Sequence, residues 1–150
     1  MGTGGTLNIV REGDLIAITL EDGESVGESL VRACEHASIT DGMIVSGIGM
    51  VRDAEIGYWD GKKYNVDRYG DPSELLSMHG SIATEAGKPS LHIHVNLSGK
   101  DHNSFGGHLV GATVNNVNEI AILKFFSGSF RRELNERTGL PTLRIDHGGN

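Results

Sequence analysis

Hydrophobic and polar residues alternate in short runs along most of this chain. Side chains on a β-strand point to opposite faces in turn, so this alternation indicates strands with one buried face. Turn residues separate the runs, and Asp60-Gly61 is the strongest hairpin signal among them. The pattern predicts strands at 7–10, 15–20, 43–50, 56–59, 63–69, 75–83, 90–97, 108–114 and 120–127, with a short closing strand at 143–145.

One segment has the period of a helix instead. Ser25 and Glu28 have the spacing of a capping box, in which each side chain bonds a free backbone N–H of the first turn. Apolar residues then recur at helical intervals, at Val26, Leu30, Ala33, Cys34 and Ala37. We therefore expect a helix over about 26–37 that covers a sheet.

These elements favour an α+β fold, because short turns join most of the strands and only one helix is clear. We expect a mainly antiparallel β-sheet with one or two packed helices. The length of 150 residues fits a single domain over 1–150, with its core at about 7–145. Residues 1–5 and 148–150 are predicted to be flexible ends.

Charge and composition limit the classes of partner that we expect this chain to bind. The net charge is −7 and the sequence pI is about 5.4, so the chain on average repels a phosphate backbone. Only the doublets Lys62-Lys63 and Arg131-Arg132 interrupt the acidic character, which is too little for a nucleic-acid footprint. The N-terminus lacks the pattern of a signal peptide and no run is long enough to span a membrane, so we expect a cytoplasmic protein without a membrane partner.

The strongest chemical signal lies in the segment 91–97, which reads Leu-His-Ile-His-Val-Asn-Leu. Its apolar residues face one way, and His92 and His94 project together from the other face. His108 opens the next predicted strand and lies across from them if the two strands pair. Three imidazoles with an open fourth position are typical of catalytic zinc sites. The alternative is a solvated strand face, since the chain has seven histidines.

Two further features lie close to these histidines in the predicted topology. His79, on a preceding strand with Ser77 and Ser81 on its face, is a possible neighbour of the site, and a structural or solvent-facing role is the alternative. Gly106-Gly107 precedes His108 after a predicted loop at 99–107. Two consecutive glycines there predict either a positive φ at the turn or a backbone that passes close to another chain or a ligand, and an ordinary flexible loop end is the alternative.

With these residues in view, the chain resembles the plants-and-prokaryotes conserved domain (PPC) family in its stand-alone prokaryotic form. The resemblance covers about 15–145. It is carried, in order, by the early helix, Val45-Ser46-Gly47-Ile48-Gly49, the segment 75–82 (Leu-Leu-Ser-Met-His-Gly-Ser-Ile), Leu91-His92-Ile93-His94, Phe105-Gly106-Gly107-His108-Leu109, Phe130-Arg131-Arg132-Glu133 and Thr138-Gly139-Leu140.

The resemblance implies a compact α+β fold on an antiparallel sheet, a homotrimer, and a metal-binding triad of His92, His94 and His108. The fold it implies is also similar to that of acetolactate decarboxylase, which has a three-histidine zinc site. Zinc, or another divalent metal, is therefore the expected cofactor. Plant members carry an AT-hook before this domain, and prokaryotic members are often labelled predicted DNA-binding proteins. This chain has no AT-hook, so DNA binding is not expected of it.

Two functions of different classes remain open. The first is a trimeric binding or regulatory module in which metal orders the fold or recognises a small-molecule ligand. The second is a zinc-dependent enzyme, such as a lyase or decarboxylase, that acts on a small oxo- or hydroxy-acid. The spacing identifies no catalytic residue. The charged candidates, each with a structural role as the alternative, are Glu55, Glu74, Glu119, Arg131 and Arg132.

Overall fold

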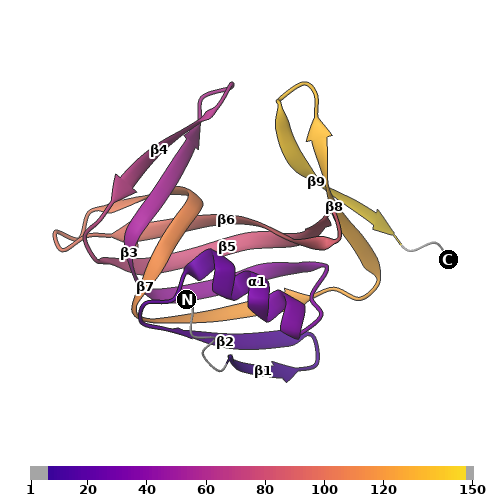
Figure 1. Cartoon of the computed structure of the whole chain (residues 1–150), viewed down its shortest axis with the longest axis horizontal. Helices are drawn as coiled ribbons and strands as arrows, with labels where there is room; N and C mark the ends of the chain where they lie inside the picture. The colour runs from indigo at the N-terminus through magenta and orange to yellow at the C-terminus, as the bar shows by residue number, and fades with distance from the viewer. Residues whose placement is uncertain (1–6, 148–150) are drawn as a thin grey trace.

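The computed structural model describes residues 7–147, which form nine β-strands and one α-helix (Figure 1). The predicted flexible ends lie outside the described residues. The predicted α+β class is confirmed, with one helix in the described range rather than two. The elements are β1 (Asn8–Glu12), β2 (Leu15–Glu21), α1 (Val26–His36), β3 (Gly42–Trp59), β4 (Tyr64–Tyr69), β5 (Ser73–Glu85), β6 (Lys88–Ser98), β7 (Ser104–Lys124), β8 (Gly128–Asn135) and β9 (Leu140–His147).

All strands belong to one sheet, and nearly every pairing is antiparallel. The main path runs β1-β2-β7-β3-β5-β8-β9, while β4 pairs with β3, and β6 pairs with both β5 and β7. The pairings of β3 with β5, β5 with β6, β6 with β7 and β7 with β3 therefore close into a circuit. This circuit encloses apolar side chains of all four strands, among them Val51, Met78, Leu97 and Val114.

Two strands are much longer than the sequence predicts. The runs at 43–50 and 56–59 form one strand, β3. The run at 108–114 and residues 120–124 of the run at 120–127 belong to β7, which also includes the end of the predicted loop at 99–107. Register shifts between β3 and β7 let these strands bend without ending. Asp53 and Asn116, with φ of 50° and 68°, lie in the bent stretches.

The helix α1 begins where the sequence predicts, but the predicted capping box is wrong. Ser25 makes no side-chain cap hydrogen bond, and its backbone instead forms a bridge to Thr113 of β7. Glu24 holds this end of the helix, because its carboxylate accepts hydrogen bonds from Ser29 Oγ at 2.8 Å and from Arg32 at 2.9 Å. The inner face of α1 packs on β2, β6 and β7 and is fully buried at Val26, Ser29, Leu30, Ala33 and Cys34.

Two hairpins project from the same side of the sheet as a pair of arms (Figure 1). The first arm is the β3–β4 hairpin around Asp60-Gly61, as predicted. The second is β8–β9, of which the sequence indicated only the segment 143–145. The two tips approach each other, since a Cβ on Gly139 would lie 3.9 Å from Trp59. The arms therefore flank a space above the sheet. No helix within 7–147 is long and apolar enough to cross a membrane.

Candidate metal centre

Strand β6 has the two-faced character that its sequence predicts. Ile93, Val95 and Leu97 are buried in the core, at 4%, 6% and 0% exposure. His92 and His94 lie on the opposite face and are exposed. β6 pairs with β5 along its whole length and with β7 from His94 to Ser98, and this pairing fixes the face of the sheet on which the two histidines lie.

The pairing of β6 brings the third histidine to the other two. His94 lies directly opposite His108 on β7, and His92 lies opposite Ser81 on β5. One ring nitrogen of each histidine falls within 4.8 Å of the others, and His92 Nε2 is 3.2 Å from His94 Nε2. Tetrahedral zinc with Zn–N bonds of about 2.0–2.1 Å would separate two of its nitrogens by about 3.3 Å. The spacing of His92 and His94 fits that requirement, and His108 lies within 4.8 Å of both.

Glycines let the three strands approach closely enough for this arrangement. A Cβ on Gly106 would lie 2.1 Å from the carbonyl oxygen of Val95, and one on Gly80 would lie 2.3 Å from that of His92. Gly107 has a φ of 156°, and its added Cβ would lie 3.0 Å from Gly57 O. The Gly106-Gly107 pair is thus part of a strand and not of a turn. Gly107 has the predicted positive φ, and Gly106 lies close to the backbone of another strand of the same chain.

Tyr64 of the first arm covers His108, a contact that the sequence does not indicate. The two rings stack with centroids 4.5 Å apart and planes 23° apart. Gly57 makes room for this contact, because its added Cβ would lie 2.9 Å from the Tyr64 ring. Aromatic cover of this kind limits how far the imidazole can rotate.

The electrostatic environment favours the neutral form of His92 and His108. Desolvation, then the neighbouring His94 and His108 and finally Arg132, lowers the pKa of His92 from 6.5 to about 4. Desolvation and His94 also lower the pKa of His108. The buried Nδ1 of His108 has no hydrogen-bond partner among residues 7–147. Neutral imidazole is the form that ligates metals, so the donor chemistry of the triad fits a zinc-class ion.

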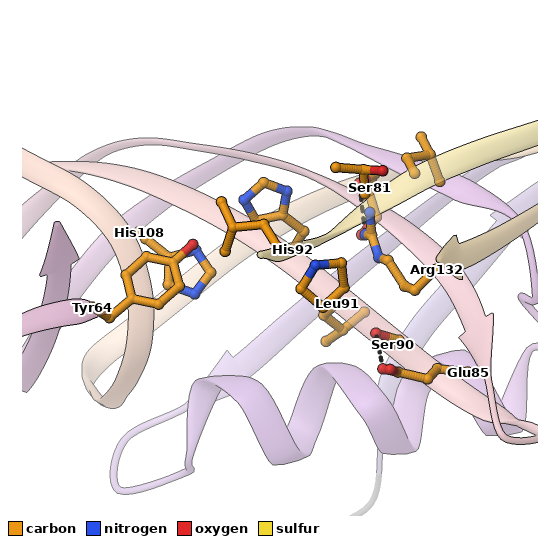
Figure 2. Close-up of a pocket in the computed structure, with 12 residues that line it drawn as sticks. Tyr64, Ser81, Glu85, Ser90, Leu91, His92, His108 and Arg132 are labelled. Carbon is orange, nitrogen blue, oxygen red and sulfur yellow. Dashed lines mark hydrogen bonds between the residues drawn. The ribbon is translucent and has the colours of Figure 1, made fainter. Parts of the chain in front are cut away.

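A cavity of about 390 Å³ opens beside the triad, between the two arms. Figure 2 shows Tyr64 and His108 on one side of His92, with Arg132 and Ser81 on the other. Arg132 comes from β8, and its Nη2 donates to Ser81 O at 3.1 Å and to Ser81 Oγ at 2.8 Å. The remaining lining comes from β5, β6 and β9, at Glu85, Ser90, Leu91, Leu140, Pro141, Thr142 and Leu143.

Of the five charged candidates from the sequence, only Arg132 lines this cavity. Arg131 forms ion pairs with Glu133 and Asp146 instead. Glu55 lies on β3 in register with Arg68 of β4, and Glu74 and Glu119 are exposed on β5 and β7.

His79 is a neighbour of the triad but not a member of it. It lies opposite His94 in the pairing of β5 with β6, so the two side chains share a face. It is exposed, and its ring is not among those that converge.

The sequence and the fold of this chain are similar to those of known proteins, over most of the length of this chain and of the matched proteins. Residues 8–126 match the family model of the Plants and Prokaryotes Conserved (PCC) domain, the family written PPC above. A metal-containing protein from Archaeoglobus fulgidus is 32% identical, with a TM-score of 0.81, 93% of this chain covered and 98% of that one. A PPC protein from Pyrococcus horikoshii is 28% identical, with a TM-score of 0.78 and 95% and 97% covered.

A third structure, of a candidate DNA-binding protein from Bacteroides thetaiotaomicron, has a TM-score of 0.84 but only 21% identity, with 92% of this chain and 96% of that one covered. At that identity the likeness concerns the fold alone. No curated protein matches this chain.

The lowered pKa of His92 predicts an acid sensitivity of the metal-free protein. Between pH 6.5 and about 4 the unfolded chain binds a proton that folded His92 does not, so acidification favours unfolding. We expect the Tm of metal-free protein to fall across that interval, and His92→Gln to make the fall shallower. Thermal unfolding followed by circular dichroism at a series of pH values measures both. His102→Gln, in an exposed loop, is the control, and equal slopes for all three proteins would contradict the prediction.

The close approach of Gly106 to the backbone of Val95 predicts that a side chain at this position weakens metal binding. Gly106→Ala must push β7 away from Val95 of β6, which separates His108 from the other two rings. We expect zinc affinity to weaken about tenfold or more, as when the support of metal ligands is disturbed. Competition against a chromophoric chelator measures it. Gly111→Ala on the same strand is the matched control, since its Cβ would meet only Glu55 at 3.7 Å, and equal affinities in the two folded variants would refute the role of Gly106.

Proposed function

The chain belongs to the Plants and Prokaryotes Conserved domain family, and on that premise we propose that it is a trimeric module that holds one zinc ion on His92, His94 and His108. The observation that carries the proposal is the convergence of three ring nitrogens within 4.8 Å on the face between the arms. The metal-containing protein from Archaeoglobus fulgidus, 32% identical, supports it.

Zinc suits this donor set better than calcium or magnesium does. Calcium and magnesium prefer oxygen ligands, and no carboxylate joins the three histidines among residues 7–147. Three imidazoles leave a fourth position for a ligand from solution, and the cavity lies beside them. When bound, zinc at such a site supplies a Lewis acid that attracts an oxygen donor.

The lining of the cavity favours a binding module over an enzyme. Arg132 stays protonated at neutral pH and does not exchange protons readily. Glu85 is the only carboxylate that lines the cavity in the described part of the chain, and it accepts a hydrogen bond from Ser90 at 3.1 Å. We therefore place ligand recognition before catalysis. A lyase or decarboxylase acting on a small oxo- or hydroxy-acid is the alternative.

DNA binding is not part of the proposal. Five arginines already form ion pairs with protein carboxylates, and the net charge of −7 repels a phosphate backbone. The pairs are Arg32–Glu24, Arg52–Asp22, Arg68–Asp53, Arg131–Glu133, Arg131–Asp146 and Arg144–Glu133.

Exposed apolar residues support self-association. Ile48 on β3, Leu76 on β5 and Val117 on β7 are 49%, 46% and 36% exposed. These strands are neighbours in the sheet, and apolar residues gathered on one outer face are a common mark of subunit contacts. We propose that this face contributes to the trimer.

The metal site predicts about one zinc ion per chain, measured by elemental analysis of purified protein. The His92→Ala/His94→Ala double variant should lose it, because one remaining imidazole cannot hold the ion. The matched control is His102→Ala, which removes an exposed histidine from the loop before β7. Unchanged zinc in the double variant would disprove the site.

The trimer predicts a mass in light scattering of about three times the 16.0 kDa of the chain at micromolar concentration. Ile48→Asp should reduce the mass, because a charge would enter the apolar contact. Val10→Asp, on the 66% exposed side chain of β1, should leave it unchanged. A monomer mass for the unmodified protein would rule out the assembly.

A further inference from the structure

We propose that the cavity between the histidine triad and Arg132 binds a small carboxylic acid as its anion. One oxygen of this ligand would bind the metal, and its carboxylate group would accept hydrogen bonds from the guanidinium of Arg132. The inference rests on the proposed metal site and names the ligand class that the site accepts. Arg132, rather than a histidine or a glutamate, is the residue that determines this class.

The positive charge of Arg132 is not part of an ion pair among the described residues. No carboxylate of residues 7–147 forms an ion pair with it, whereas the adjacent Arg131 forms two. Its Nη2 is anchored on Ser81, and the donors at Nε and Nη1 make no hydrogen bond to the described residues. Partial burial lowers the pKa of Arg132, and the nearby Glu85 acts against that shift. A partly buried guanidinium whose Nε and Nη1 donors are free favours a carboxylate partner.

The position of Arg132 relative to the triad follows from strand register. Ser81 lies directly opposite His92 in the pairing of β5 with β6, and Ser81 is the residue that anchors Arg132. Arg132, His92 and His108 also line the same cavity. One small molecule can therefore reach both the triad and the arginine.

Charge balance points to the same ligand. Three neutral imidazoles leave a divalent ion with its full charge, and Arg132 adds one more positive charge to the lining of the same cavity. Among the described residues no carboxylate joins the triad, and Glu85 is the one negatively charged side chain that lines the cavity near Arg132. An anion bound between the two groups offsets part of both positive charges.

The cavity suits a small organic acid rather than a large polyanion. Its volume of about 390 Å³ is at the lower end of ligand pockets. Leu91, Leu140, Pro141 and Leu143 give it apolar walls, and Ser90 and Thr142 add hydroxyl groups. Glu85 repels a second negative charge at its end of the cavity. Arg132 and the β9 lining lie beyond the matched residues 8–126, so the ligand side is built by the C-terminal arm.

The experiment measures binding of acetate, pyruvate and L-lactate to the zinc-loaded protein by isothermal titration calorimetry. The corresponding amides serve as neutral probes of the same shape, and inorganic phosphate is a competing anion. Zinc content is determined on each sample. Cobalt-substituted protein gives a second readout, because a carboxylate that reaches the metal changes the cobalt absorption spectrum.

Arg132→Gln removes the charge, and Arg132→Lys keeps it without the fork of donors. The matched control is Arg131→Gln, one residue away, whose ion pairs are exposed and contribute little to stability. We expect at least one of the three acids to bind the unmodified protein with a change in the cobalt spectrum. Affinity should fall about tenfold or more in Arg132→Gln, less in Arg132→Lys, and less than about twofold in Arg131→Gln. The amides should not bind.

Outcomes separate the two proposals. Absence of zinc from the unmodified protein overturns the proposed function, and this inference with it. Zinc at one per chain with no binding of any acid overturns only this inference. Equal affinity in Arg132→Gln and Arg131→Gln, equal binding of the amides, or tighter binding of phosphate than of every acid also overturns it. If Arg132→Gln fails to fold, the loss in Arg132→Lys relative to Arg131→Gln decides the matter.

Discussion

The structure depends on one constraint above all, which is the fixed register of β6 between β5 and β7. That register sets His94 opposite His108 and His92 opposite Ser81, while the alternating residues of β6 enter the core. A slip of one residue would exchange the two faces, burying imidazoles and exposing Ile93 and Val95. The burial of the apolar face therefore fixes the geometry of the polar one, and stability and site geometry share a single cause.

Several parts of this arrangement can be predicted from the sequence. The unbroken alternation at 91–97 fixes which face carries the histidines, and Asp60-Gly61 marks the first arm. The continuity of β3 and β7 could not be predicted, because the bends lie near Asp53 and Asn116, whose positive φ values have no local sequence signal. Strands broken by such bends look like two separate strands in a hydrophobicity pattern.

The cavity shows a different limit of sequence reasoning. Arg131 and Arg132 are equivalent as a doublet, but adjacent residues on a strand face opposite ways. In the structure, Arg131 pairs with Glu133 and Asp146, and Arg132 binds Ser81 in the cavity wall. Tyr64 gives no signal either, since its role depends on how the first arm leans over His108. Residues that act through the meeting of distant segments leave no local pattern, whereas the His-x-His pair does.

The two sides of the candidate site have different structural support. The triad stands on β6 and β7, which are paired along both edges and packed on the core. The second arm is joined to the rest by fewer contacts, chiefly the parallel bridge between Thr84 and Arg131, the anchor of Arg132 on Ser81, and the hydrogen bond that Phe130 N donates to Asp41. Few of these contacts involve the triad, so changes in the arm can alter the cavity wall without moving the histidines. If the triad holds the proposed metal, a rigid set of ligands beside an independently built wall would let the bound small molecule change while the metal chemistry stayed the same.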